Sequence, residues 1–374
     1  MKSIITIFLT FFLLSSCISD ETNRKNQESV SQDNQTVTLI FGGDVMHHMP
    51  QMTAAFDSET QTLDYRPGFQ FVKPYIESAD LAICNLETVF AGKPYSGYPQ
   101  FSSPDELLYA LKDTGFDILQ LANNHILDKG SRGLERTIQL IQENGIYSIG
   151  AYINKDHRDK YYPPIYTVKG VKIAFLNYTY STNGLTVNKP NIVNRLDSVQ
   201  IIKDIHYSRE RGADIIVAMA HWGQEYRLES DSTQCGWTGF LVRNQVDVII
   251  GSHPHVVQNA EIKVFEEKKI PIFYSVGNLI SNQRKLHQNG GIFAKIEINP
   301  ENKRITNISY VPFYVYKGYL QGKNQYYLIP TADYLSNSLI LDLPPSNNYE
   351  LTTFHYETTN RLNNIPVNEH FTVN

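Results

Sequence analysis

Apolar residues in this chain gather in short runs that alternate with segments of helical spacing. Runs rich in branched side chains begin near residues 38, 81, 117, 146, 171, 214 and 247, and their length is typical of buried strands. Between them, the spacing predicts helices over residues 104–113, 133–143, 196–210 and 236–244. We expect Pro104 at the first position of its helix and a left-handed stop at Gly145. The repetition predicts an α/β sheet with helices on both faces.

The hydrophobic pattern changes after residue 255. Residues 259–265, 271–276, 291–298 and 304–315 alternate between apolar and polar positions with no long helix between them, which predicts antiparallel strands added to the sheet. A further strand is expected at residues 326–329 and a helix near residues 349–362. The sheet topology is therefore expected to be mixed.

Polar side chains follow five of the apolar runs at the point where each run ends. They are Asp44, Glu87, Asn124, His221 and the pair His253 and His255. Because ligands of open α/β sheets bind outside the carboxyl ends of the strands, these residues converge if their strands share a sheet. Taken singly, each has an ordinary explanation, such as a turn residue at Asn124 or a hydrogen-bonded core histidine at His221. Their repeated placement favours one common site.

The side chains at these strand ends are carboxylates, an amide and imidazoles. This mixed set of oxygen and nitrogen donors suits borderline divalent ions such as manganese, iron or zinc better than calcium. A carboxylate such as Glu87 can bridge two ions, and a water shared by ions about 3.5 to 4 Å apart is acidic enough to act as hydroxide near neutral pH. We therefore predict a divalent metal centre that holds two ions.

Composition supports a large globular fold and argues against nucleic acid as a partner. The chain has 374 residues, of which 41% are apolar, and a formal net charge of −5. This length and apolar content predict one or two domains with a substantial core. Positive and negative charges are nearly balanced and lysine and arginine form no run, so no nucleic-acid partner is expected.

The amino terminus has the pattern of an export signal. Its apolar stretch, residues 4–14, is too short to span a bilayer and is followed by small residues. Leu14-Ser15-Ser16-Cys17 resembles the bacterial lipobox, which implies a lipoprotein signal peptide over residues 1–17 and lipidation of Cys17. The alternative is a signal peptide cleaved elsewhere, with Cys17 incidental. Residues 18–36 are polar and are expected to form a flexible linker to a membrane of the cell envelope.

Six motifs, in this order, resemble those of the CapA family, which is associated with biosynthesis or export of poly-gamma-glutamate capsules. They are Phe41-Gly42-Gly43-Asp44-Val45-Met46, Asn85-Leu86-Glu87-Thr88, Ala122-Asn123-Asn124-His125-Ile126-Leu127-Asp128-Lys129-Gly130, His221-Trp222-Gly223-Gln224-Glu225-Tyr226, Gly251-Ser252-His253-Pro254-His255-Val256 and Tyr274-Ser275-Val276-Gly277-Asn278. The resemblance spans residues 37–330 and leaves residues 331–374 as a carboxyl-terminal extension. It implies the fold of the calcineurin-like metallophosphoesterases, a four-layer sandwich of two mixed β-sheets flanked by helices.

The resemblance also implies two ion positions that share one carboxylate. The ligands of the first ion would be Asp44, Glu87 and His255, and those of the second would be Glu87, Asn124, His221 and His253. Phosphoesterases of this type place a histidine two residues after the first aspartate, where this chain has Met46, and use aspartate in place of Glu87. His48 is the candidate substitute, because one turn would bring it to face the same way as Asp44, whereas His47 is expected to face solvent.

The remaining motif residues receive roles in catalysis and substrate binding. By resemblance, His125 would protonate the leaving oxygen, and Asp128 would orient its imidazole. Glu225 and Tyr226 have no phosphoesterase counterpart and are assigned to the substrate groove. Asn278 is either a turn residue or a hydrogen-bond donor in the site.

Two functions follow from these features. The first is a surface-anchored, metal-dependent hydrolase of metallophosphoesterase type that acts on a phosphoester in capsule or poly-gamma-glutamate biosynthesis. The second is a factor on the same fold that binds, assembles or exports the anionic polymer with membrane partners of capsule synthesis and catalyses nothing. Polyglutamate contains amide bonds and no phosphorus, so the association of the family and the chemistry of the site point to different substrates.

Overall fold

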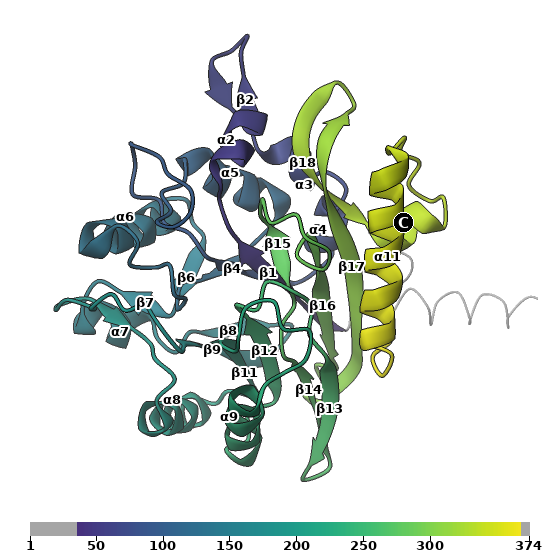
Figure 1. Cartoon of the computed structure of the whole chain (residues 1–374). Coiled ribbons are helices and arrows are strands. Elements are labelled where there is room, and N and C mark those ends of the chain that lie inside the picture. Colours follow the sequence, from purple (N-terminus) through teal and green to yellow (C-terminus); the bar gives the residue numbers. More distant parts are fainter. Residues whose placement is uncertain (1–35, 368–374) are drawn as a thin grey trace, which may run out of the picture. The chain divides into compact units, whose positions relative to one another are not determined.

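The computed structural model describes residues 36–367, whose strands form two mixed β-sheets and two short pairs (Figure 1). The larger sheet has the order β18-β17-β16-β1-β4-β5-β6, and β15 pairs with β1. Its strands are β1 (Val37–Val45), β4 (Leu81–Leu86), β5 (Ile118–Gln120), β6 (Tyr147–Ile149), β15 (Asn278–Ile280), β16 (Gly290–Ile298), β17 (Ile305–Leu320) and β18 (Lys323–Pro330). Strands β1, β4, β5 and β6 are parallel, and β16, β17 and β18 extend the sheet in antiparallel fashion.

The smaller sheet also has a parallel centre, and it has an antiparallel strand at each edge. Its strands, in the order of the sheet, are β13 (Ala260–Phe265), β14 (Lys268–Phe273), β12 (Val248–Ser252), β11 (Ile215–His221), β9 (Val171–Thr179) and β8 (Ile165–Val168). Strand β14 is parallel to β12, whereas β13 and β8 are antiparallel to their neighbours. The short pairs join β2 (Phe56–Asp57) to β3 (Thr62–Leu63) and β7 (Ala151–Tyr152) to β10 (Ile192–Val193).

The central strands are apolar on both faces because each face enters a different core. Side chains alternate along a strand, so Leu39 and Phe41 of β1 pack between the sheets while Ile40 packs against helices. In β11, Val217 joins the core between the sheets and Ala218 joins a third core on the outer face. This burial on both sides explains why these strands appear in the sequence as continuous apolar runs.

Most helices cover the outer faces of the two sheets, whereas the last two helices pack against the core that includes the space between the sheets. They are α2 (Met49–Ala55), α3 (Arg66–Phe69), α4 (Lys73–Glu77), α5 (Asp105–Thr114), α6 (Gly130–Glu143), α7 (Lys155–Tyr161), α8 (Ser198–Glu210), α9 (Ser232–Arg243), α10 (Thr331–Leu335) and α11 (Pro345–Arg361). Leu108 of α5 and Ile138 of α6 share a core with β1, and Ile201 of α8 and Leu241 of α9 share one with β11. The layers are helix, sheet, sheet and helix, which confirms the predicted fold class.

The structure corrects three details of the predicted elements. Helix α5 begins at Asp105, because Pro104 has the extended conformation of an N-cap (φ −62°, ψ 146°). Helix α9 begins four residues before the predicted position 236, because the Asp231 side chain caps it by accepting a hydrogen bond from Gln234 N. The sequence predicted antiparallel strands after residue 255, but strand β14 is parallel to its neighbour β12. Gly145 has the predicted left-handed conformation after α6 (φ +71°).

The carboxyl-terminal part packs on the larger sheet. Leu351 and Phe354 of α11 are buried in the core that also contains Tyr310 and Tyr314 of β17. The predicted boundary at residue 330 stays a prediction. The signal peptide, Cys17 and almost all of the predicted linker lie outside the described residues. Within residues 36–367, no helix combines the length and the apolarity needed to cross a bilayer.

Candidate metal centre

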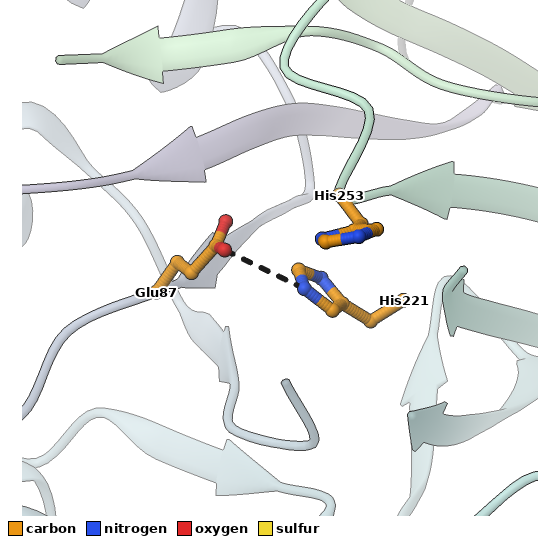
Figure 2. Close-up of side chains that lie close together, drawn as sticks. All are labelled: Glu87, His221 and His253. Carbon is orange, nitrogen blue, oxygen red and sulfur yellow. Dashed lines mark ion pairs between the residues drawn. The ribbon is translucent and has the colours of Figure 1, made fainter. Parts of the chain in front are cut away.

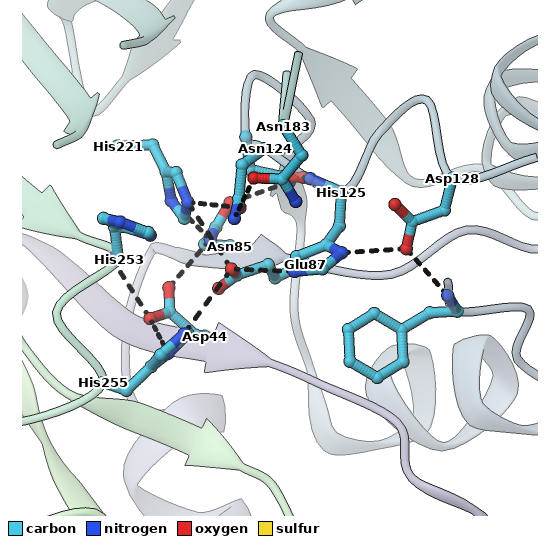
Figure 3. A network of polar contacts seen from close by, with 12 residues as sticks. Asp44, Asn85, Glu87, Asn124, His125, Asp128, Asn183, His221, His253 and His255 are labelled. Atoms are coloured by element: carbon cyan, nitrogen blue, oxygen red, sulfur yellow. Dashed lines mark hydrogen bonds and ion pairs between the residues drawn. The ribbon is translucent and has the colours of Figure 1, made fainter. Parts of the chain in front are cut away.

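The polar residues predicted at strand ends meet at the carboxyl ends of the parallel strands of both sheets (Figure 3). Strand β1 brings Asp44, the turn after β4 brings Glu87, the loop after β5 brings Asn124, β11 ends in His221, and the loop after β12 carries His253 and His255. All six side chains are buried. The sheet order explains the meeting, because β1 and β4 are neighbours in one sheet and β11 and β12 are neighbours in the other.

Gly43 permits the close approach that places Asp44 in the site. A Cβ atom at position 43 would lie 1.8 Å from the Gly277 carbonyl oxygen, which instead accepts a hydrogen bond of 3.0 Å from Asp44 N. Strand β1 therefore continues through both glycines to Val45, and Asp44 stands opposite Asn278 of β15.

Glu87 is a buried carboxylate surrounded by imidazoles. Its Oε1 atom lies 3.5 Å from His221 Nε2, 3.8 Å from His255 Nε2 and 4.0 Å from His125 Nε2. The side chain is 0% exposed, and neither carboxylate oxygen has a hydrogen-bond partner. A buried charge without hydrogen bonds is strongly unfavourable, and a cation bound beside Glu87 would offset this cost.

Two groups of donor atoms around Glu87 have the size of a metal site. Asp44, Glu87 and His255 form one group, and the donor atoms of each group lie within 4.8 Å of one another. Glu87, His221 and His253 form the other group (Figure 2). His253 Nδ1 is also buried without a partner. Carboxylate and imidazole donors are suitable ligands for manganese, iron or zinc. The donor set and its orphaned atoms therefore fit one or two divalent cations.

Asn124 lies beside the second group. Its Oδ1 atom is 2.8 Å from His221 Nε2, and its Nδ2 atom donates to Asn183 Oδ1 at 3.2 Å. The amide oxygen and the imidazole nitrogen are thus brought to the same point. Asn124 therefore lies next to the three other residues that the resemblance assigned to the second ion.

The electrostatics of the centre favour the metal-binding forms of two histidines. Burial lowers the pKa of His221 to about 3 and lowers the pKa of His253 well below its usual value, so both rings are neutral. Burial alone would also lower the pKa of His255, but the charges of Glu87 and Asp44 outweigh it and raise that pKa to about 9. Burial and the charge of Asp44 raise the pKa of Glu87 well above its usual range. A bound cation would replace these protons.

An asparagine that the sequence analysis did not single out connects the two groups. Asn85 Nδ2 donates to Asp44 Oδ1 at 2.8 Å and lies 3.3 Å from His221 Nδ1, while its Oδ1 accepts from Asn123 Nδ2 at 3.2 Å. Asn85 is the one polar residue of strand β4. A polar side chain in a strand buried on both faces was the available signal, and it lies two residues before Glu87.

We expect Asn85→Ala to weaken Mn²⁺ binding by at least about ten-fold, because residues that orient metal ligands typically contribute that much. The substitution frees Asp44 Oδ1 and removes a contact of His221. Titration of the metal-free protein with Mn²⁺ measures the effect, and thermal unfolding in EDTA verifies that the variant folds. Unchanged Mn²⁺ affinity in a folded variant would show that Asn85 does not position the ligands.

His125 is anchored at one nitrogen and faces Glu87 with the other. Its Nδ1 atom lies 2.8 Å from Asp128 Oδ2, which also accepts a hydrogen bond of 2.7 Å from Phe101 N. The Phe101 ring packs edge-on against the imidazole at 4.7 Å between centroids. Both His125 and Asp128 line a cavity of about 350 Å³, together with Asn124. The structure thus places the residues assigned to proton transfer beside the candidate metal ligands and next to a cavity.

The expectations for His47 and His48 need correction. Residues 44–48 are not helical, since Asp44 lies in β1 and His48 is the extended N-cap of α2 (φ −108°, ψ 153°), so the argument from one turn is wrong. His48 Nδ1 accepts a hydrogen bond from Asn282 N at 3.3 Å, and His48 belongs to none of the donor groups found among the described residues. His47 does not face solvent, because it is 0% exposed and its Nε2 lies 2.8 Å from Tyr65 OH.

The residues assigned to the substrate groove lie at the edge of the centre. Glu225 is exposed and lines the cavity. Tyr226 OH accepts a hydrogen bond of 3.3 Å from Gln283 Nε2. Asn278 lies in β15 rather than in a turn, with its Oδ1 atom 3.1 Å from His255 Nδ1 and its Nδ2 atom donating to the His255 carbonyl at 3.3 Å. Of the two interpretations of Asn278, the structure supports a hydrogen-bonding residue of the site.

Comparison with known proteins agrees with this geometry. The sequence model of the family described as bacterial capsule synthesis protein PGA_cap matches residues 38–283. The capsule biosynthesis protein CapA of Bacillus anthracis is 29% identical over 267 residues, covering 67% of this chain and 61% of that protein. The PGA biosynthesis protein CapA of Bacillus subtilis (strain 168) is 30% identical over 253 residues, covering 66% of this chain and 64% of that protein. The chain therefore spans less than two thirds of the length of these curated relatives.

Two solved structures are similar to this one at low sequence identity. The NAD nucleotidase of Haemophilus influenzae superposes with a TM-score of 0.50 at 13% identity, covering 90% of this chain and 65% of that one. The calcineurin-like phosphoesterase YfkN from Bacillus subtilis has a TM-score of 0.44 at 14% identity, covering 87% of this chain and 98% of that one. The chain shares its fold with the NAD nucleotidase. Since the family model covers the strands that carry every metal-ligand candidate, the chain belongs to the bacterial capsule synthesis protein PGA_cap family, and the two CapA proteins are its relatives.

Proposed function

We propose that this protein is a metal-dependent hydrolase with a site of metallophosphoesterase type, which acts in capsule or poly-gamma-glutamate biosynthesis. The observation that carries the proposal is the Glu87 carboxylate, fully buried without a hydrogen bond between the imidazoles of His221, His255 and His125. Such a buried charge destabilises a fold unless a cation compensates it. The protein is further proposed to be exported and held at the cell envelope through Cys17.

The ligands proposed for the two ions share Glu87. They are Asp44, Glu87 and His255 for one ion and Glu87, Asn124, His221 and His253 for the other. Divalent ions bound there would supply Lewis acidity toward a phosphoryl oxygen and a water of lowered pKa. The family match and the donor set support divalent metal, with manganese, iron and zinc as the candidates.

His125 is proposed as the group that protonates the leaving oxygen. Asp128 fixes the ring through Nδ1, so the Nε2 atom remains directed toward Glu87 and the neighbouring cavity. A substrate bound in that cavity would present its leaving oxygen to Nε2. General acid catalysis of this kind contributes about 10²- to 10⁴-fold to a rate.

A second candidate function is favoured by the names of the relatives. Two of them are called capsule or PGA biosynthesis proteins. Poly-gamma-glutamate contains amide linkages and no phosphorus. On this alternative the protein binds, assembles or exports the anionic polymer with membrane partners of capsule synthesis, the metal contacts polymer carboxylates, and no bond is cleaved. A phosphoester that is formed or consumed during polymer assembly would reconcile the relatives' names with the hydrolase.

Metal analysis of the full-length protein tests the proposal. After reconstitution with Mn²⁺, Fe²⁺ or Zn²⁺ and removal of excess ion, we expect about two ions per chain, in line with two-metal sites of this type. The loaded protein is then assayed with aryl phosphomonoesters and phosphodiesters and with polyglutamate. Turnover of a phosphoester supports the hydrolase, whereas polymer binding without turnover of any substrate supports the alternative. Failure to retain any of the three metals would remove the basis of both.

A further inference from the structure

Glu225 lies at the cavity side of the metal centre. Its carboxylate and one ring nitrogen from each of His253 and His255 lie within 4.8 Å of one another. This third donor group shares His253 with the group of Glu87 and His221, and it shares His255 with the group that contains Glu87 and Asp44. Glu225 is exposed and lines the cavity, whereas Glu87 is fully buried. Two carboxylates therefore converge on the same pair of imidazoles, one from the interior and one from the cavity.

The backbone that carries Glu225 is fixed to the loop that carries the two histidines. Tyr226 N donates to the Pro254 carbonyl at 2.8 Å, and Gln258 Nε2 donates to the Arg227 carbonyl at 2.9 Å. Pro254 is the residue between His253 and His255. The distance between the Glu225 backbone and the imidazoles is thus set by hydrogen bonds rather than left to a free loop.

A series of side-chain contacts leads from His255 to Tyr226, the residue next to Glu225. Asn278 Oδ1 lies 3.1 Å from His255 Nδ1, Asn278 Nδ2 donates to Gln283 Oε1 at 2.9 Å, and Gln283 Nε2 donates to Tyr226 OH at 3.3 Å. The residue next to Glu225 is therefore linked to His255 through side chains as well as through the backbone.

The imidazole of His253 supplies an independent indication of a ligand. It is 2% exposed, and its Nδ1 atom has no hydrogen-bond partner. A buried imidazole nitrogen without a hydrogen-bond partner can serve as a metal donor. Because His253 belongs both to the group with Glu87 and to the group with Glu225, an ion held by this ring has carboxylate oxygens available from two directions.

We propose that Glu225 is a further metal ligand, which closes the centre on its cavity side together with His253 and His255. This inference rests on the proposed function, because it requires the metal centre. The carboxylate adds an anionic oxygen to a position otherwise bounded by imidazole nitrogens, which strengthens binding of a divalent ion. Since Glu225 stands at the entrance, an anionic substrate such as a phosphoester competes with it for the ions. Glu225 thereby couples substrate binding to release of one ligand.

Titration of the metal-free, full-length protein with Mn²⁺ tests the inference, with free Mn²⁺ followed by electron paramagnetic resonance. We expect Glu225→Gln to weaken binding of at least one ion by about ten-fold or more, the scale on which residues around metal centres act. Glu229→Gln is the matched control, because Glu229 is exposed on the same loop and belongs to none of the donor groups among the described residues. It should bind Mn²⁺ as the wild type does. Equal unfolding temperatures in EDTA verify that both variants fold.

Binding of inorganic phosphate to the Mn²⁺-saturated protein supplies a second measurement. If Glu225 competes with the anion, calorimetry should give a tighter phosphate dissociation constant for Glu225→Gln than for the wild type and for Glu229→Gln. Wild-type Mn²⁺ affinity in Glu225→Gln, or an equal loss in Glu229→Gln, would overturn the inference and leave the proposed function standing. Absence of Mn²⁺ binding by the wild type would instead overturn the proposed function itself.

Discussion

Glu87→Gln is expected to abolish stabilisation of the protein by Mn²⁺ while leaving the metal-free protein at least as stable as the wild type. Glu87 is common to both proposed ion positions, so its loss removes the one anionic ligand that the two ions share. The amide keeps the size of the side chain but carries no charge. In the absence of metal, the wild-type carboxylate is buried without a hydrogen bond, which is costlier than a buried neutral amide.

The size of the first effect follows from linkage. Mn²⁺ at one hundred times its dissociation constant should stabilise the wild type by about 2.7 kcal/mol. The variant should show no shift at the same concentration. Thermal and urea unfolding, each with EDTA and with Mn²⁺, measure both differences on the same protein.

The pH dependence of the stability of the metal-free protein gives a second test of whether the ionised Glu87 carboxylate destabilises the fold. Burial raises the pKa of Glu87 well above the usual 4.5, so the folded state holds this proton more tightly than the unfolded state. Stability should therefore fall as pH rises from about 4.5 toward the raised pKa, because the unfolded state ionises first. Glu87→Gln has no such proton, so its stability advantage in EDTA should grow over that pH range.

Glu106→Gln is the control for Glu87→Gln. Glu106 is partly buried in α5, and its Oε2 atom also lacks a hydrogen-bond partner, but it belongs to none of the donor groups found in residues 36–367. Its replacement should leave Mn²⁺ stabilisation unchanged. A Glu87→Gln variant that Mn²⁺ still stabilises as strongly as the wild type would refute the assignment of Glu87 as a shared ligand.

His125→Ala is expected to lower phosphoester turnover by about 10²- to 10⁴-fold while Mn²⁺ affinity stays within a factor of about three. The imidazole lies in the cavity wall, is held by Asp128 and belongs to none of the donor groups among the described residues. Its loss removes a proton donor and no metal ligand. Steady-state kinetics on the substrate found in the panel and Mn²⁺ titration measure the two quantities separately.

Two further variants make the His125 result specific. Asp128→Asn should lower turnover by a smaller factor, because the imidazole remains but loses the carboxylate that orients it. His206→Ala, an exposed histidine of α8, should have no effect on turnover. If His125→Ala retains full activity, the hydrolase assignment fails. Polyglutamate binding that survives in His125→Ala without any turnover by the wild type would favour the polymer-binding alternative.

Much of the fold could be inferred from the sequence because the relevant signals are local. The apolar runs that became β1, β4, β11 and β12 are continuous because both of their faces are buried, and that pattern is visible without neighbours. The start of α9 was also available, since Asp231 and Gln234 have the spacing of a capping box. The error at Pro104 is of one residue, which local propensity does not resolve.

The contacts of individual side chains in the site depend on the path of the loops and strands, which local sequence signals do not reveal. His47 and His48 are adjacent in sequence, yet His47 is buried against Tyr65, whereas His48 is the N-cap of α2 and contacts Asn282. Their fates depend on the chain leaving β1 in an extended conformation rather than as a helical turn. The contacts of Asn85 with Asp44 and His221 likewise depend on which side chains lie across the two sheets.

The sequence by itself determined the strands, the donors at their ends and the family. A donor at the end of a strand lies at the edge of the sheet, whichever strand is its neighbour. The donors Asp44, Glu87, His221 and the His253–His255 pair could therefore be identified from side-chain periodicity and sequence motifs alone. Only the tertiary structure decided that Glu87 is left without a hydrogen bond and that Glu225 reaches the same imidazoles from the cavity. The physical reason is that burial and hydrogen-bond partners depend on elements far apart in the chain, whereas side-chain period depends only on the strand itself.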